Sequence, residues 1–335
     1  MAVDFDGTNI PGPTITGTTA GAPGNDELAQ VVVKATFDKI IGFKLRSEPM
    51  YRRFATVQPM DVAYPGASVD MFIQTQDLAL ATTPLAEYAD PDSVPLPAPE
   101  KVTMTLNEYG NATVTTMRLR EESWSQIDPY QGELLARNLR DTVDKLVEDV
   151  AFAQAGGVSG NGFKRFNVPT AGGISAGAGS GTAGDYGTIN SGAIRRLVAN
   201  FRKDNIMEMD SGQFIGMIHP DQSVDLREET DVAGWRFPHT SENADTFIWN
   251  GSVGVYENVQ FIESPRVPVT NGVYQSLFLG KQALAEGVVR EFGSVVTPQI
   301  DKFRRLYGLG YYGFAGWCIY REEAGQILET TSTAV

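Results

Sequence analysis

The segment from residue 51 to residue 121 most constrains what this chain can fold into, because it predicts a long β-arm with little core of its own. Side chains alternate along residues 69–76 and 102–107 with the period of two that is typical of strands covered on one face. A turn is predicted near 109–111, and the alternation then resumes along 115–120. Isolated two-stranded hairpins are marginal in water, so the arm is expected to rest on another surface, with a neighbouring subunit as the natural candidate.

The tip of this arm is rich in proline. Between its first two strands the chain contains Pro84, Pro91, Pro95, Pro97 and Pro99. Proline fixes φ and lacks a backbone donor, so the tip is expected to be extended and difficult to pair into a sheet.

Apolar spacing predicts three helices. The first follows Asn25 and carries a wide stripe between Leu28 and Ile41. The second covers 128–155, with Asp128 as its cap, Pro129 at its first position and Gly156-Gly157 as its stop. At about 1.5 Å per residue it would be roughly 40 Å long, which suits a spine. The third carries one apolar face, formed by Ile194, Leu197, Val198 and Phe201.

The rest of the chain reads as strands and loops. Residues 1–25 are rich in Gly, Pro and Thr and predict an extended arm, while the Gly, Ser and Ala content of 156–187 predicts a mobile loop. Strands are expected at 214–218, 259–262, 276–279 and 306–320. No fixed-period repeat occurs, and the mixed order of elements indicates an α+β fold.

Charge and composition argue against a tight nucleic-acid binder and against a membrane-spanning or secreted protein. The net charge is −14, and no run of Lys or Arg offers the basic patch that tight nucleic-acid binders use. An acidic wall can still enclose DNA without holding it, although the charge could equally serve solubility alone. No stretch reaches the roughly 18 apolar residues of a membrane span, and the N-terminus shows no secretory pattern. Cys318 is the only cysteine, so no disulfide can form within one chain.

Several short patterns resemble catalytic signatures but lack their context. Gly173-Ile174-Ser175-Ala176-Gly177 fits G-x-S-x-G, yet Ser175 lies in a predicted loop and not in a strand-to-helix turn. Two further matches fit G-x-G-x-x-G, but the one at 179–184 lies in the predicted loop and the one at 308–313 lies among strand-forming aromatics with no helix after it, so neither has the strand-to-helix context of a dinucleotide site. The chain has two histidines, His219 and His239, and one cysteine, Cys318, which are few ligands for a zinc site built from His and Cys. His219 is interpreted as a hydrogen-bonded structural residue. We therefore expect no enzyme activity, no cofactor and no metal.

The order of these segments resembles a known family. Residues 217–220 followed by 225–227 look like a strand-to-helix element of phage coat proteins, and 254–264 look like their strand that ends in Glu-Ser. Residues 277–283 and the closing run from 301 to 320 are similar too. Together they resemble the Hong Kong 97-type fold of tailed-phage major capsid proteins over nearly the whole chain.

The resemblance implies a division of the chain. It comprises an N-terminal arm and helix (1–50), an extended β-arm over the adjacent subunit (51–121), a peripheral domain with the spine helix and Gly-rich loop (122–187), a mainly axial domain (188–300), and C-terminal strands that return to the peripheral domain (301–335).

The resemblance also implies a function. Copies would self-assemble into pentamers and hexamers of an icosahedral virion shell around double-stranded DNA, without sequence-specific binding, after synthesis in the host cytoplasm. The expected partners are other copies, a separate scaffolding protein, a portal and possible decoration proteins, with no membrane. Some members of this family link their subunits covalently through a Lys–Asn bond. Lys101 is the only lysine between Ala55 and Arg118, and the arm tip has none, which argues against covalent cross-linking from the tip. An encapsulin-like compartment and, remotely, a serine hydrolase using Ser175 are the alternatives.

Four charged residues at the end of the arm are candidate intersubunit contacts: Arg118, Arg120, Glu121 and Glu122. They would form ion pairs with a neighbour, or else mark a solvated strand end.

Overall fold

The architecture is that of a computed structural model. It describes residues 49–58, 66, 68–74, 76–80, 82, 84, 93–123, 127–153, 162–170, 173–177, 183–229, 254–297, 303 and 305–334. The predicted N-terminal arm and the predicted helix after Asn25 lie outside these residues.

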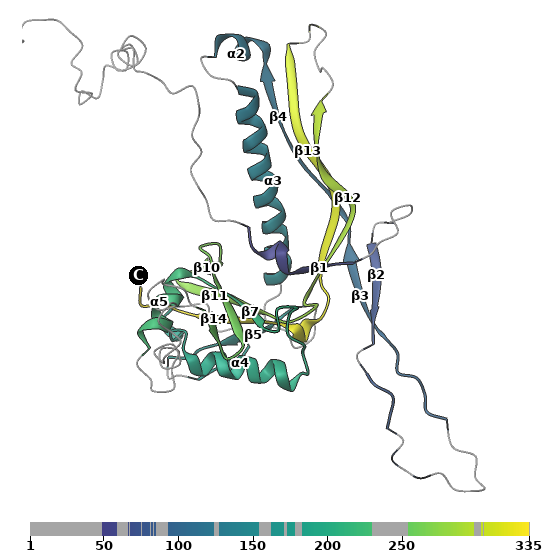
Figure 1. Cartoon of the computed structure of the whole chain (residues 1–335), viewed down its shortest axis with the longest axis vertical. Helices are drawn as coiled ribbons and strands as arrows, with labels where there is room; N and C mark the ends of the chain where they lie inside the picture. Colours follow the sequence, from purple (N-terminus) through teal and green to yellow (C-terminus); the bar gives the residue numbers. More distant parts are fainter. Residues whose placement is uncertain are drawn as a thin grey trace, which may run out of the picture.

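The chain is organised as a long sheet with a spine helix, a compact unit at its base and a projecting hairpin (Figure 1). The long sheet has the order β1-β12-β13-β4. Its strands are β1 (Ala55–Val57), β12 (Leu284–Thr297), β13 (Leu306–Ile319) and β4 (Asn107–Thr116). β13 pairs antiparallel with β12 and β4, so the sheet joins segments that are nearly 200 residues apart in sequence.

β4 corrects the turn predicted at residues 109–111. The strand continues through this segment because β13 pairs with it, with Tyr109 opposite Gly313 and Asn111 opposite Tyr311. A Cβ on Gly110 would stand 2.7 Å from the backbone oxygen of Tyr311. The glycine therefore permits close approach between strands and does not make a turn.

The spine helix α3 (Ile127–Phe152) confirms the predicted long helix, although it begins one residue before Asp128 and ends before the predicted glycine stop. Its predicted apolar stripe faces inward, with Leu135, Val143 and Val147 buried. The Tyr311 hydroxyl on β13 donates a 2.7 Å hydrogen bond to Oδ1 of Asn138 and so fixes the helix against the sheet. At about 1.5 Å per residue the helix spans roughly 39 Å.

The compact unit is built on an eight-stranded sheet of order β6-β5-β14-β11-β7-β9-β8, with β10 also paired to β11. Its strands are β5 (Lys164–Asn167), β6 (Ser175–Ala176), β7 (Phe214–Ile218), β8 (Val255–Tyr256), β9 (Val259–Glu263), β10 (Val269–Thr270), β11 (Val273–Leu279) and β14 (Gly325–Thr330). Its helices are α4 (Ser191–Lys203) and α5 (Pro220–Glu228), and short 3₁₀ turns lie at η1 (Tyr51–Phe54), η2 (Ala183–Asp185) and η3 (Glu322–Ala324). The predicted helix at 194–201 and the strands predicted at 214–218, 259–262, 276–279 and 306–320 are confirmed.

β5 corrects the loop predicted for residues 156–187. Although the surrounding sequence is rich in glycine, Phe163, Phe166 and Val168 are buried in the core, and β5 pairs parallel with β14. The four-residue strand is too short for its periodicity to stand out from the glycine-rich segment around it.

Each of the two sheets combines strands from distant parts of the sequence. β5 and β14 both lie in the compact sheet, whereas β12 lies in the long sheet. The chain passes from the long sheet to the compact sheet between β13 and β14, through η3 alone.

A buried ion pair ties the spine helix to the compact unit. Nη1 of Arg165 on β5 lies 2.8 Å from Oε1 of Glu329 on β14, and both side chains are about 5% exposed. Nη2 of Arg165 donates a 3.0 Å hydrogen bond to the carbonyl of Phe152, the last residue of α3. The Tyr186 hydroxyl donates a 3.2 Å bond to the other oxygen of Glu329. This network satisfies two buried charges at the point where the helix meets the sheet.

Gly316 on β13 is expected to tolerate no side chain. A Cβ there would collide with the backbone oxygen of Thr105, where the root of the hairpin crosses the long sheet. We expect Gly316→Ala to lower the free energy of unfolding by about 1–3 kcal/mol, measured by urea unfolding at constant m-value. Gly293→Ala in the same sheet is the matched control, because nothing lies within 4 Å of its Cβ position. Equal stability of the two variants would contradict the close approach.

Candidate functional site

The first candidate site is the projecting hairpin. β2 (Ser68–Ile73) and β3 (Glu100–Thr105) pair antiparallel from Ser68 opposite Thr105 to Ile73 opposite Glu100, which confirms the first two strands predicted for the arm. The hairpin extends away from both the compact unit and the long sheet, and β3 leads directly into β4 (Figure 1). Its position is therefore set by the long sheet, to which β4 belongs.

Apolar side chains on the hairpin and its tip face solvent. Leu80 and Leu96 are each 85% exposed, Phe72 is 65% exposed, and Leu78 and Val94 are half exposed. Single exposed apolar residues are common on protein surfaces, whereas several along one projection are typical of an interaction surface.

The root of the hairpin is held by polar contacts. Nζ of Lys101 lies 2.7 Å from Oδ2 of Asp70, and the hydroxyl of Thr103 donates a 2.8 Å bond to Oδ1 of the same carboxylate. The hydrogen bond from Lys101, followed by that from Thr103, holds the pKa of Asp70 below its usual value. These cross-strand contacts fix the register of β2 against β3.

A narrow cleft separates the hairpin root from the turn after β13. It has a volume of about 40 Å³ and is lined by Glu100, Lys101, Tyr320 and Glu322, among others. Burial raises the pKa of Glu322, and the neighbouring carboxylates Glu323 and Glu100 raise it further. Carboxylates therefore gather in the cleft between the hairpin root and the turn after β13.

The second candidate site lies at the opposite end of the long sheet and contains the predicted contact residues. These residues form α2 (Met117–Glu122), not the predicted strand end, because the hydroxyl of Thr116 caps the helix by accepting a 3.2 Å bond from the Leu119 amide. The structure thus brings all four predicted residues together on one short helix beside α3 and β13 (Figure 1).

The four charges differ in their surroundings. Nε of Arg118 lies 2.7 Å from Oε1 of Glu122 in an exposed pair, with 83% and 63% of the two side chains accessible. The guanidinium of Arg120 stands 4.6 Å from the centre of the Tyr307 ring. Glu121 is exposed. An exposed pair such as Arg118–Glu122 contributes little to the stability of the folded chain, so forming it does not prevent these two charges from meeting another copy.

Sequence reasoning missed the apolar residues around α2. At this end of the molecule Val296 is 71% and Phe303 78% exposed, and other partly exposed apolar side chains are Val114, Leu119, Leu134 and Val295. The only signal in the sequence is the isolated Phe303 among charged neighbours, and a pattern of this kind does not show that a side chain is exposed.

Exchanging the charges of the α2 ion pair tests the predicted contacts. Arg118→Glu combined with Glu122→Arg retains an i,i+4 pair within the chain but reverses the charge offered to a neighbour. We expect the free energy of unfolding to change by less than about 0.5 kcal/mol and the yield of assembled particles to fall severalfold. Sedimentation and electron microscopy measure the yield. If the yield of particles is unchanged, these charges contact solvent and do not contact a neighbouring copy.

The residues of the hydrolase alternative do not form a catalytic arrangement. Ser175 is exposed on the two-residue edge strand β6, and Gly177 follows it with φ of +102°. His219, the described histidine, caps α5: its Nδ1 accepts a 3.3 Å bond from the Asp221 amide. His219 is a structural residue, as expected from the sequence.

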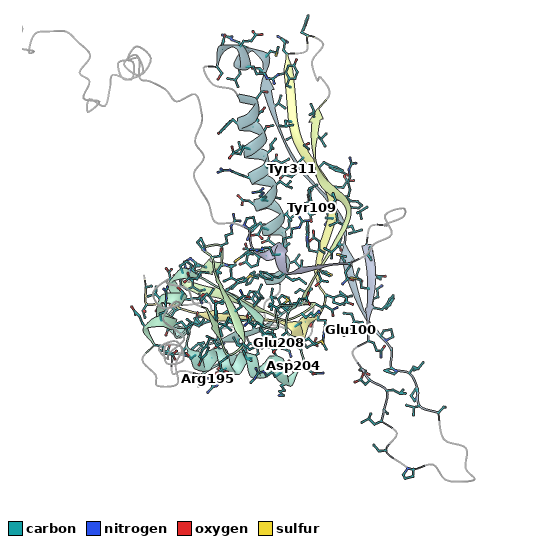
Figure 2. All side chains as sticks on the ribbon, in the orientation of Figure 1. Glu100, Tyr109, Arg195, Asp204, Glu208 and Tyr311 are labelled. Atoms are coloured by element: carbon teal, nitrogen blue, oxygen red, sulfur yellow. The ribbon has the colours of Figure 1, made fainter. Side chains whose placement is uncertain are left out.

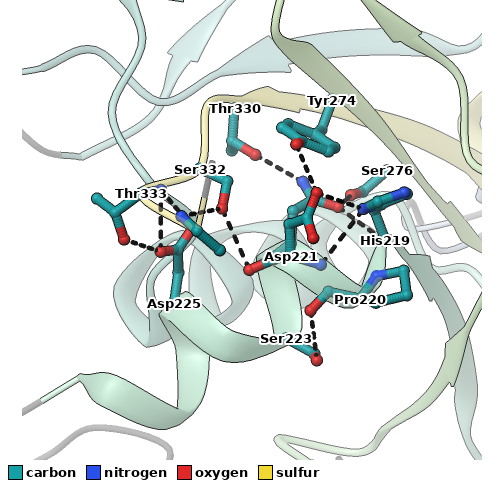
Figure 3. A network of polar contacts seen from close by, with 12 residues as sticks. His219, Pro220, Asp221, Ser223, Asp225, Tyr274, Ser276, Thr330, Ser332 and Thr333 are labelled. Carbon is teal, nitrogen blue, oxygen red and sulfur yellow. Dashed lines mark hydrogen bonds and ion pairs between the residues drawn. The ribbon is translucent and has the colours of Figure 1, made fainter. Parts of the chain in front are cut away.

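The polar network around α5 anchors the last described residues (Figure 3). The Tyr274 hydroxyl donates a 2.7 Å bond to Asp221, and the Ser332 hydroxyl donates a 3.2 Å bond to the carbonyl of the same residue. The Thr333 amide donates a 3.1 Å bond to Asp225. These partners are side chains and backbone groups that hold the tail of the chain on the compact unit.

The described residues contain neither a metal-ligand cluster nor a membrane-spanning helix. Among those residues, no group of three or more His, Cys, Asp or Glu side chains is placed to hold a metal ion. None of the described helices has the length and apolar character needed to cross a membrane.

Comparison with solved structures identifies proteins that share the fold of this chain. No protein-family model and no curated protein matches the chain. Among solved structures, the capsid of the cyanophage P-SCSP1u matches with a TM-score of 0.66 at 12% identity, covering 91% of this chain and 94% of that chain. The capsid of Ralstonia phage GP4 matches with a TM-score of 0.62 at 13% identity, covering 90% and 96%. The acid-stable capsid of Helicobacter pylori bacteriophage KHP30 matches with a TM-score of 0.63 at 12% identity, covering 90% and 97%. The chain therefore has the mixed α+β fold of tailed-phage capsid proteins, and the expected fold class is confirmed.

Proposed function

We propose that this chain is the major capsid protein of a tailed phage and that its copies form the pentamers and hexamers of an icosahedral shell around double-stranded DNA. The observation that carries the proposal is the solvent-exposed hairpin with its row of apolar side chains, found on a fold shared with phage capsids. Such a chain has apolar surface at its two extremities that folding alone does not cover.

The mechanism is association through these extremities. The hairpin of one copy would lie over the adjacent copy, and the apolar residues around α2 would meet other copies at the far end of the long sheet. Fully burying one leucine contributes about 1.5–3 kcal/mol. Because each copy would contact several others in a closed shell, many weak contacts would act together.

The proposed regions follow the expected division of the chain. Residues 51–121 would form the arm over the neighbour, 122–187 would contribute the spine helix to a peripheral domain, and 188–300 would contribute most of an axial domain. Residues 301–335 would connect the two, because β13 and β14 belong to different sheets. Support for this division comes from the separation of the long sheet from the compact unit.

The proposed partners follow from the same role. Other copies of the chain are the main partner, and a scaffolding protein, a portal and decoration proteins would act during or after assembly. The protein would reside in the virion and act by assembly, not by catalysis. The net charge of −14 supports an enclosing wall from which packed DNA is mostly repelled.

Negative-stain electron microscopy of the purified full chain tests the proposal, first alone and then co-expressed with a candidate scaffolding protein. Closed shells, tubes or rings of five and six copies are the expected result. Small discrete particles under both conditions would overturn it. Shells that contain protein cargo and no DNA, when isolated from infected cells, would instead identify a protein compartment.

A further inference from the structure

Helix α4 presents a cationic face on an otherwise acidic protein. Its thirteen residues, Ser191–Lys203, include Arg195, Arg196, Arg202 and Lys203 and no acidic residue. The whole chain has 41 acidic and 27 basic residues, so the absence of carboxylates from this helix runs against the composition.

The four cations lie on one side of the helix. At 100° per residue, Arg195 and Arg202 project in nearly one direction, and Arg196 and Lys203 in another about 100° away, with Ala199 between the two lines. The opposite side carries the buried residues Ala193, Ile194, Leu197, Val198 and Phe201. Because that side is buried in the core, the cationic face is held in a fixed orientation along the compact unit. Figure 2 labels Arg195, in the first half of the helix, and Asp204, which directly follows its last residue.

Three of these cations have no carboxylate partner within the described part of the chain. Arg196, Arg202 and Lys203 are exposed, whereas the nearby Lys164 pairs with Asp204 at 2.6 Å. Arg195 is held in place by the hydroxyl of the buried Tyr256, at 2.7 Å and 3.0 Å, and by Glu257 at 3.2 Å.

Helix stability does not account for this arrangement. On α2 and α3, several cations pair with a carboxylate one turn away, as Arg118 does with Glu122 and Arg137 with Glu133. The helix dipole favours cations at the C-terminal end, which accounts for Arg202 and Lys203, but it does not favour Arg195 and Arg196 nearer the N-terminal end.

We propose that this face, formed by Arg195, Arg196, Arg202 and Lys203, is a weak, sequence-independent binding site for the phosphate backbone of nucleic acid. A row of cations around the small Ala199 can approach phosphates closely, and none of the exposed large apolar side chains belongs to α4. A protein partner would need an apolar anchor at the centre of its contact, so a polyphosphate fits this face better than a second protein does. The identification of the polyanion as double-stranded DNA rests on the proposed shell function.

The site would allow a chain that is acidic as a whole to hold an enclosed polyanion weakly. Each copy would contact about three or four phosphates, which gives low affinity per copy and a measurable dependence on salt. In a shell, many copies would act together, so DNA would be held loosely at defined points while the rest of the wall repels it.

The test is binding of the full chain to a fluorescent 30-base-pair duplex of arbitrary sequence, measured by anisotropy between about 20 mM and 200 mM salt, with the dispersed state checked by sedimentation. We expect log affinity to fall with log salt with a slope of roughly −3. Arg196→Gln with Lys203→Gln should weaken binding about tenfold at low salt and make the slope shallower by roughly 2. The matched control is Arg137→Gln with Lys145→Gln on α3, which removes the same charge from two cations that have carboxylate partners and should leave binding within about twofold.

Three outcomes would overturn the inference. They are no salt-dependent binding by the wild-type chain, equal weakening by both double variants, or an α4 variant that alters contact between copies while binding DNA normally. Circular dichroism confirms that α4 remains folded in the variant. Electron microscopy of the same samples separates this inference from the proposed function, since shells without DNA affinity would overturn only the binding site, and DNA affinity without shells only the capsid role.

Discussion

Replacing Leu80 and Leu96 with aspartate is expected to abolish shell formation while leaving the folded chain as stable as the wild type. Both side chains are 85% exposed in the isolated chain, so their removal costs the fold almost nothing. In the proposed assembly they are buried against a neighbour, where the two leucines contribute roughly 3–6 kcal/mol per arm and an aspartate would be left without solvent. Because the loss recurs at every contact in the shell, we expect a decrease in particle yield of more than a hundredfold.

Thermal unfolding and sedimentation of the same preparations measure the two effects separately. The control is Leu80→Met with Leu96→Met, which retains apolar side chains of similar volume and should retain shells. If the aspartate variant forms shells in normal yield, the hairpin tip is not a contact between copies. If both variants fail to assemble, the effect does not depend on the apolar character of the tip.

Replacing Arg165 with leucine is expected to lower the free energy of unfolding by about 3–5 kcal/mol, the largest effect we expect from a single substitution. The change would leave Glu329 buried without its 2.8 Å ion-pair partner and would free the carbonyl of Phe152 at the end of α3. The hydrogen bond from the Tyr186 hydroxyl to the carboxylate would not replace the lost positive charge.

The double variant Arg165→Leu with Glu329→Leu provides the control. It removes both buried charges together, so it should recover more than half of the stability lost in the single variant. Urea unfolding of the wild type, the two single variants and the double variant completes the cycle. Two results would show that the pair does not tie α3 to the compact unit. One is a free energy of unfolding of Arg165→Leu within about 1 kcal/mol of the wild type, and the other is a loss in the double variant equal to the sum of the two single losses.

The sequence predicted those elements whose pattern is local. The alternation in β2 and β3 identified the hairpin, and the apolar stripe of α3 identified the spine helix, because burial of one face leaves a short-range period. The turn expected at residues 109–111 was wrong, since Gly110 owes its place to a strand that is nearly 200 residues away. The strand predicted across 115–120 ends at Thr116, whose hydroxyl caps α2 by accepting a bond from the Leu119 amide. β5 was missed because its four residues are too few to show a period within a glycine-rich segment.

The candidate sites were predictable only in part. Arg118, Arg120, Glu121 and Glu122 could be chosen because charge is visible in sequence, and they do lie together on α2. The exposure of Leu80, Leu96 and Phe303 could not be foreseen, because an apolar residue in a sequence is ordinarily assigned to the core. Exposure depends on where the fold ends, which is a property of the whole architecture.

The strand order of the two sheets has a consequence for synthesis on the ribosome. β13 stands between β12 and β4, and β14 stands between β5 and β11, so each sheet has an interior position that remains empty until the last segments have been translated. At about 5–20 residues per second, the interval between β4 and β14 corresponds to roughly 10–40 s during which neither sheet can close. Nascent chains on one messenger RNA are crowded together during that time, yet they lack the long sheet that positions both the hairpin and α2. Neighbouring copies therefore cannot begin to join until each has been completed through residue 330.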